Sequence, residues 1–158
     1  MKYIVKMASH NNYTSGFDDF KTPSSVWGDI LEFIPDKEIW CPFYFKGDHT
    51  LSEFKNIIHT DEDFFETNKG EIVIDNPPFS TKKQVLQRLK DLEKPFILIL
   101  PVSTITYQYF QNIFKGDNIQ IIIPKKRIKF IDNKSSAPFD CLYVCYKVGL
   151  DKDINFLN

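Results

Sequence analysis

The sequence predicts one α/β domain with a mostly parallel sheet and helices on both faces. Strand-like apolar segments alternate with stretches whose apolar residues recur at helical spacing. Residues 96–100 form a continuous apolar run, which is typical of a strand buried on both faces. With 158 residues, 42% of them hydrophobic, the chain can form one substantial core. We expect an N-terminal arm over residues 1–20, the domain over 21–150, a C-terminal tail over 151–158, and no separate target-recognition domain.

The first helix is expected to begin at Thr22, as N-cap, with Pro23 in the first helical position, and to end at Pro35. The last two strands have no helix between them, so they predict an antiparallel hairpin at one edge of the sheet. Strands are predicted over 38–41, 57–60, 71–75, 96–100, 120–123 and 142–146, and further helices over 51–57, 80–92 and 104–114.

The sequence Asn76-Pro77-Pro78-Phe79 directly follows the strand predicted over 71–75. Two prolines cannot continue a strand ladder, because both lack an N–H and both fix φ near about -65°. The strand therefore ends in a rigid loop that aims the Asn76 amide and the Phe79 ring in fixed directions. A fixed acceptor beside a flat ring can hold a planar amine, such as the exocyclic amine of a nucleobase. The alternative is an ordinary turn, since Asn-Pro starts turns, and Asp75 is interpreted as a turn or cap residue rather than a base.

Composition and charge restrict the classes of function. The net charge of -1 gives no global basic field for nucleic acid, so phosphate contacts would need a local patch. One basic segment is available, and it is either a solvated hairpin or a phosphate-binding patch: Lys125, Lys126, Arg127 and Lys129. The three cysteines and three histidines lack metal-ligand spacing, so we expect no metal and a reducing, intracellular (cytoplasmic) compartment. No secretory signal and no membrane-length apolar run is evident.

Three predicted strand ends, residues 41–48, 59–65 and 75–80, should meet at one rim of the sheet. In this order they resemble S-adenosylmethionine-dependent methyltransferases that modify exocyclic amines of DNA bases, especially adenine-N6 enzymes of the phage and viral type. The likeness covers about residues 20–147. It implies a Rossmann-like class I methyltransferase fold, S-adenosylmethionine as cofactor and DNA as partner. It also implies that the tetrapeptide Asn76, Pro77, Pro78 and Phe79 is catalytic and that Phe79 stacks on the target base.

The same resemblance implies a set of cofactor-binding residues: Thr22, Pro23, Pro42, Phe43, Tyr44, Gly47, Asp61, Asp63, Phe64 and Asn76. Two positions depart from the family pattern, because Cys41 stands where the family has an acid and Phe45 where it has a glycine. These departures leave open an inactive relative that binds nucleic acid or a protein partner. A further alternative is the same chemistry on cytosine N4, RNA or a protein glutamine. The sequence also leaves open a homodimer.

Overall fold

The computed structural model describes residues 22–43, 54–58, 62–130 and 140–158. The expected N-terminal arm, residues 1–20, lies outside them. The described elements, with η marking 3-10 helices, are α2 (Ser24–Gly28), η1 (Leu31–Phe33), β1 (Ile39–Trp40), β2 (Ile57–Ile58), β3 (Ile72–Asp75), η3 (Phe79–Thr81), α3 (Lys82–Asp91), β4 (Phe96–Pro101), η4 (Val102–Thr106), α4 (Gln108–Phe114), β5 (Ile119–Ile123), β6 (Cys141–Tyr146) and β7 (Ile154–Phe156).

The strands form one mixed sheet in the order β2-β1-β3-β4-β6-β5-β7. Strands β2, β1, β3 and β4 are parallel, which confirms the predicted mostly parallel sheet. The predicted antiparallel pairing of the strands over 120–123 and 142–146 is confirmed, because β5 and β6 pair antiparallel towards one end of the sheet, and β6 also pairs antiparallel with β4. The edge is β7, which pairs parallel with β5 and lies within residues 151–158, the segment expected to be a tail. Three residues are too few for a clear strand pattern.

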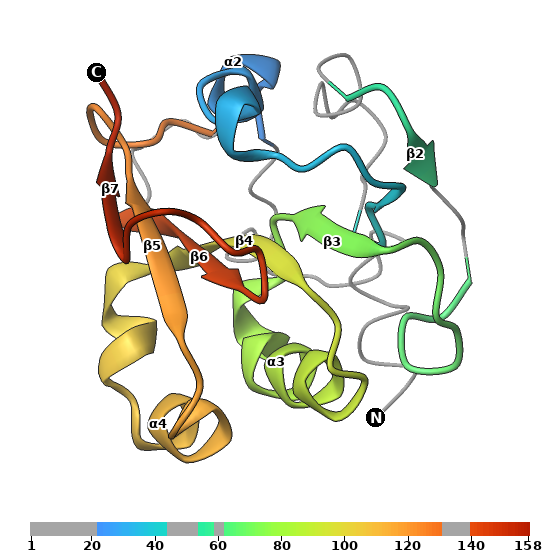
Figure 1. Ribbon diagram of the computed structural model, residues 1–158. Helices are drawn as coiled ribbons and strands as arrows, with labels where there is room; N and C mark the ends of the chain where they lie inside the picture. Colours follow the sequence, from blue (N-terminus) through green and yellow to red (C-terminus); the bar gives the residue numbers. More distant parts are fainter. Residues whose placement is uncertain (1–21, 44–53, 59–61, 131–139) are drawn as a thin grey trace.

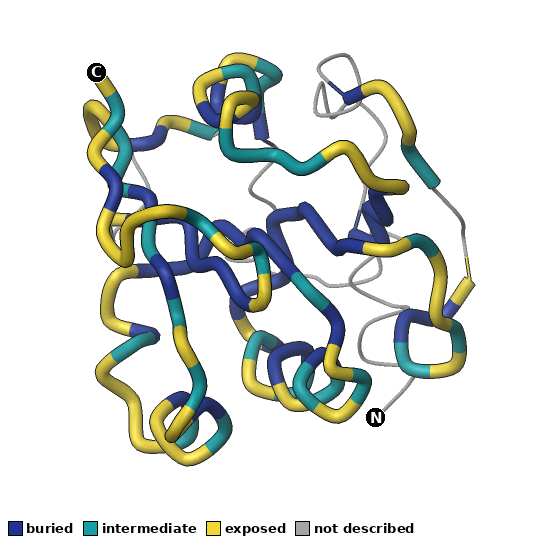
Figure 2. The backbone as a smooth tube through the Cα atoms, viewed as in Figure 1, coloured by how far each residue is buried: buried dark blue, intermediate teal, exposed yellow. Residues whose placement is uncertain are grey.

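Helices cover both faces of the sheet (Figure 1), as the sequence predicts. Alternate residues of the central strands supply the two cores, since successive side chains of a strand point to opposite faces. Ile74 and Ile97 pack in the core that contains Trp27 of α2, whereas Val73 and Leu98 pack in the core that contains Leu86 of α3. Figure 2 shows these strands as the most continuously buried part of the described chain. No helix of the described residues has the length and apolar character needed to cross a membrane.

Two helices differ from the sequence prediction. The helix expected over 22–35 is a five-residue α2 followed by η1, and its N-cap is Pro23, without a side-chain capping bond. The Thr22 side chain is instead engaged by the residue that follows β3, as described below. The short helix expected over 51–57 is not seen in its described part, where Ile57 belongs to β2. Pairing of Ile57 and Ile58, which are half-buried, with β1 overrides the weak helical spacing.

Candidate active site

The diproline corner lies at the carboxyl end of β3. Residues Asn76 to Phe79 are all buried, and the chain turns within them from strand β3 into η3. The turn is held from the helical side, because the backbone N–H and the hydroxyl of Thr81 donate to the Pro78 carbonyl at 3.2 and 3.3 Å. The Pro77 carbonyl accepts no hydrogen bond from the residues that the structure describes. The Pro78 carbonyl is therefore engaged within the turn, whereas the Pro77 carbonyl takes no part in holding it.

Asp75, the last residue of β3, joins the loop after β1 to the corner. Its Oδ2 accepts a hydrogen bond from the Phe43 backbone N–H at 2.6 Å, and its Oδ1 accepts one from the Asn76 backbone N–H at 2.8 Å. The residue is 3% exposed, so both bonds are made to a desolvated carboxylate and are strong. The bond to the Asn76 N–H is the local contact expected of a turn or cap residue. The bond to the Phe43 N–H is a long-range contact that the sequence does not predict. Asp75 is a positioning residue for two loops.

The Asn76 side chain is fixed by Thr22, which lies 54 positions earlier in the chain. The Nδ2 group of Asn76 donates to the Thr22 hydroxyl oxygen at 3.1 Å, and both residues are buried. This bond sets the orientation of the amide and so the direction of its carbonyl oxygen. The segment before α2 thus contributes directly to the corner.

A second aromatic ring, absent from the sequence-predicted set, lies beside the corner. The rings of Phe79 and Phe130 meet edge to face, with centroids 6.4 Å apart and planes at 75°. Phe79 is 2% exposed and Phe130 is partly buried. The sequence signal that could have identified Phe130 is its position directly after the basic segment 125–129. Because Phe79 is 2% exposed, a base can stack on its ring only after side chains that cover it have moved aside.

The residues expected to hold the cofactor are partly brought together. Phe43 is buried against Phe64, with ring centroids 4.9 Å apart, and Phe64 in turn stacks on Trp40 at 5.4 Å. Asp63 is buried and its Oδ1 accepts from the Phe65 backbone N–H at 2.9 Å, so it shapes the turn that carries Phe64. Three expected residues lie outside the described residues, as does Phe45: Tyr44, Gly47 and Asp61.

Cys41, at the position of the family's acid, has its side chain turned to the neighbouring strand. Its thiol donates to the Ile74 carbonyl at 3.3 Å and the residue is buried. The three cysteines are free and buried, and burial raises the pKa of both the Cys141 and Cys145 thiols to about 12. These thiols stay protonated at neutral pH and are poor nucleophiles or ligands. Among the described residues no group of three or more His, Cys, Asp or Glu could hold a metal ion.

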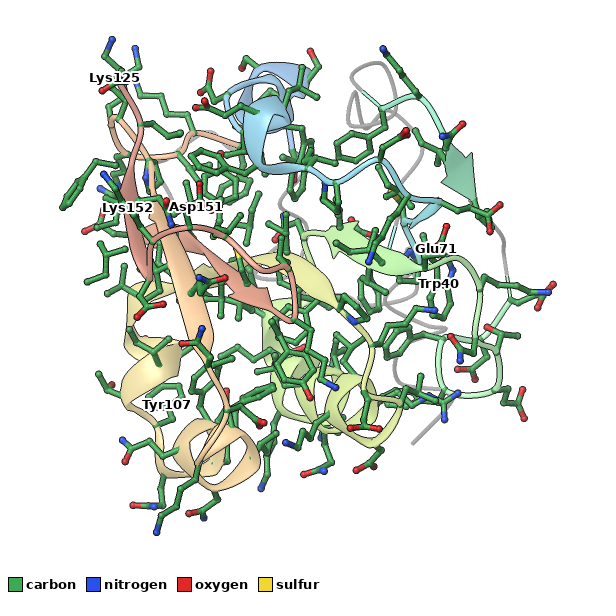
Figure 3. All side chains as sticks on the ribbon, viewed as in Figure 1. Trp40, Glu71, Tyr107, Lys125, Asp151 and Lys152 are labelled. Atoms are coloured by element: carbon green, nitrogen blue, oxygen red, sulfur yellow. The ribbon has the colours of Figure 1, made fainter. Side chains whose placement is uncertain are left out.

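The basic segment lies beside the start of α2. A cavity of about 320 Å³ separates them, and it is lined by Pro23 on one side and the basic side chains on the other. The Tyr143 hydroxyl, at the same cavity, donates to the Val26 carbonyl at 2.6 Å. Arg127 is also bonded to Asp140 at 3.0 Å, so part of its charge is compensated. Figure 3 shows Lys125 at the upper left of the molecule. All four basic residues of the segment are exposed: Lys125, Lys126, Arg127 and Lys129.

Comparison with known proteins agrees with this arrangement. A protein of Pyrococcus horikoshii, provisionally assigned as an RNA methyltransferase, superposes with a TM-score of 0.50 over 91% of this chain and 94% of its own, at 15% identity. This likeness, with the strand order, defines a Rossmann-like methyltransferase fold. In sequence, the chain is 30% identical to the Type II methyltransferase M.EcoRI of Escherichia coli over 48% of its length. The match spans 29% of that enzyme, so the chain corresponds to less than a third of it. No protein-family model matches the chain.

Proposed function

We propose that this methyltransferase-like protein transfers a methyl group from S-adenosylmethionine to the exocyclic N6 amine of adenine in DNA. The observation that carries the proposal is the diproline corner at the carboxyl end of β3, with Asn76 fixed by Thr22 and with Asp75 joining it to the loop after β1. Ligands of open α/β sheets bind at such strand ends. The partial sequence match to a Type II methyltransferase supports the choice of DNA.

The residues at the ends of β1 and β3 fit the methionine end of this cofactor. Asp75 fixes the two loops at this place through its carboxylate, and Thr22 and Asn76 supply polar side chains beside it. The rings of Phe43 and Phe64 are buried and pack on each other. They therefore support the loop after β1 from the interior and do not form an exposed lining for the cofactor. When bound, S-adenosylmethionine supplies an electrophilic methyl group on a sulfonium.

The side chains of the corner then have separate roles. The Asn76 amide oxygen and the Pro77 carbonyl oxygen each accept a hydrogen bond from one N–H of the adenine amine. The lone pair of the amine nitrogen is then directed out of the plane of the base. Phe79 and Phe130 flank the base after their edge-to-face contact opens. No residue of the corner has to act as a general base before the transfer, because the neutral amine already carries the reacting lone pair. The S–CH3 bond would break as the N–CH3 bond forms, the thioether S-adenosylhomocysteine would leave, and the extra proton on N6 would pass to water.

Incubation of the protein with labelled S-adenosylmethionine and mixed-sequence DNA tests the proposal. N6-methyladenine is expected, and Asn76→Ala should abolish it. Asn112→Ala is the matched control, because Asn112 lies exposed on α4 and bonds only to Gln108 among the described residues. Full activity of Asn76→Ala would refute the role of the amide. Arms with cytosine-only DNA, RNA and a glutamine peptide separate the other planar amines that this geometry could hold.

A second candidate is an inactive relative that binds nucleic acid or a protein through the same rim. The observation that favours it is Cys41, whose thiol is engaged by Ile74 where the family has an acid. Loss of one charge-assisted hydrogen bond lowers cofactor affinity by about one to two decades. Calorimetry with S-adenosylmethionine decides between the two: a micromolar dissociation constant supports the enzyme, and a millimolar or weaker one supports the inactive relative.

A further inference from the structure

A second basic stretch begins directly after the diproline corner. Residues 76–90 contain four cations and no acid, and residues 95–116 contain one cation and no acid. All four cations of residues 76–90 lie on α3, which ends in the single acid Asp91, whereas η4 and α4 carry no charged residue. In a chain of net charge -1, this is a local excess of positive charge on α3. It lies on the face of the sheet opposite α2, so it is distinct from the segment 125–129.

Two lysines at the start of α3 and two tyrosines that follow η4, at the beginning of α4, form a mixed basic and aromatic area, here called the α3–η4 surface: Lys82, Lys83, Tyr107 and Tyr109. Lys82 links it to the corner, because its Nζ donates to the Phe79 carbonyl at 3.1 Å and lies 5.5 Å from the Tyr107 ring centroid. Lys83 lies 5.8 Å from the Tyr109 ring centroid and is itself exposed. Tyr107 remains 42% exposed, and Figure 3 shows it on the η4–α4 side of the molecule.

We infer that the α3–η4 surface binds single-stranded DNA next to the target base, with an unpaired base on the Tyr107 ring and a phosphate at Lys83. This inference rests on the proposed function. The exposed Tyr107 ring has Lys82 on one side and the Tyr109 ring 5.6 Å away, and Lys83 lies over Tyr109. Such a pair of rings with two cations suits a base and a phosphate together. A base within a duplex cannot reach such a ring, because both of its faces are stacked. The corner thus lies between two basic areas, and a strand crossing it can be held on both sides.

Fluorescence anisotropy with a labelled single-stranded oligodeoxynucleotide, its duplex and the matching RNA tests the inference. Tyr107→Ala should weaken single-strand binding about tenfold and leave duplex binding unchanged. Tyr107→Phe keeps the ring and should bind as the wild type does. Lys83→Ala should lower the slope of log affinity against log salt by about 0.7, the value for one phosphate of a single strand. Lys152→Ala, which removes an exposed cation beside β7, is the control and should change neither quantity.

Wild-type single-strand affinity in both Tyr107→Ala and Lys83→Ala would overturn the inference. Equal weakening of single-strand and duplex binding would overturn the stacking role of Tyr107, and tighter binding of RNA than of DNA would overturn the choice of partner. These outcomes are separable from the proposed function, because binding is read without cofactor. If methylation of DNA is observed but the variants bind normally, the inference fails alone. If the protein binds no S-adenosylmethionine but the variants lose affinity for single-stranded DNA, the inference about the α3–η4 surface is supported and the proposed methyltransferase activity is refuted.

Discussion

Replacing Asp75 with asparagine is expected to lower the free energy of unfolding by about 2–4 kcal/mol, because one acceptor then serves two buried donors. In the wild type each carboxylate oxygen accepts one backbone N–H, from Phe43 at 2.6 Å and from Asn76 at 2.8 Å. Asparagine has the same shape but only one acceptor oxygen, and its NH2 group must face the second N–H. One of the two loops therefore loses its anchor.

The magnitude follows from the contacts. The lost charge-assisted hydrogen bond contributes about 1.5–3 kcal/mol, and the N–H left without an acceptor in the interior costs about 1–3 kcal/mol more. Part of this loss is offset, because the neutral amide is easier to desolvate than the carboxylate, which is 3% exposed. The net effect is a large share of a typical domain stability of about 5–15 kcal/mol.

Urea denaturation followed by circular dichroism measures this effect. Asp63→Asn is the matched control, because Asp63 is also buried but its side chain accepts only one N–H, from Phe65, among the described residues. Asparagine can keep that bond, so the control should lose less than about 1 kcal/mol. An unfolding free energy of Asp75→Asn no lower than that of Asp63→Asn would refute the assignment of Asp75 as the link between the loops.

Three further predictions address other parts of the molecule. Gly70→Ala should lower the unfolding free energy by about 1–3 kcal/mol, since Gly70 has φ +62° and a Cβ would lie 3.1 Å from a backbone oxygen; an unchanged urea midpoint would contradict this. Thr22→Val should slow methyl transfer about fivefold to tenfold by releasing the Asn76 amide, whereas Thr22→Ser should retain the rate. Burial raises the pKa of Cys145 from 9.0 to about 12, so its contribution to stability is complete below pH 9 and is lost as the pH rises towards 12. The urea midpoint of the wild type should then fall more steeply above pH 9 than that of Cys145→Ala.

The parts of the fold that sequence alone predicts are those set by local pattern. Strand β4 is a continuous apolar run, and the corner after β3 follows from two consecutive prolines, so both were predicted at the right place. The position of β6 between β4 and β5 was not predicted, because strand order depends on pairing between distant segments. The six residues of β6 are all apolar or aromatic, a pattern that favours an inner strand, but the pattern does not identify the strands on either side of it.

The site shows the same division between local and long-range information. The Asn-Pro-Pro-Phe sequence is contiguous, and its rigidity needs no partner. The bonds from Asn76 to Thr22 and from Asp75 to Phe43 join segments 54 and 32 positions apart, and no local pattern encodes them. The sequence predicts a capping role for Thr22, because threonine before a Pro-initiated helix commonly caps it. The buried amide of Asn76 competes for the same hydroxyl and takes it.

These contacts also give a physical reason for the unusual residue at position 41. Strands β1 and β3 are neighbours, and Trp40 is paired with Val73, so the positions that follow, Cys41 and Ile74, are adjacent. An aspartate at position 41 would direct its oxygens at the Ile74 carbonyl, which now accepts from the thiol, and would place a second negative charge in the buried region already occupied by the Asp75 carboxylate. Two carboxylates so close in a desolvated site repel, and one would have to be protonated. A neutral weak donor at position 41 is therefore compatible with a carboxylate at position 75, and of the two strand-end residues that the structure describes here, the acid stands on β3 and not on β1.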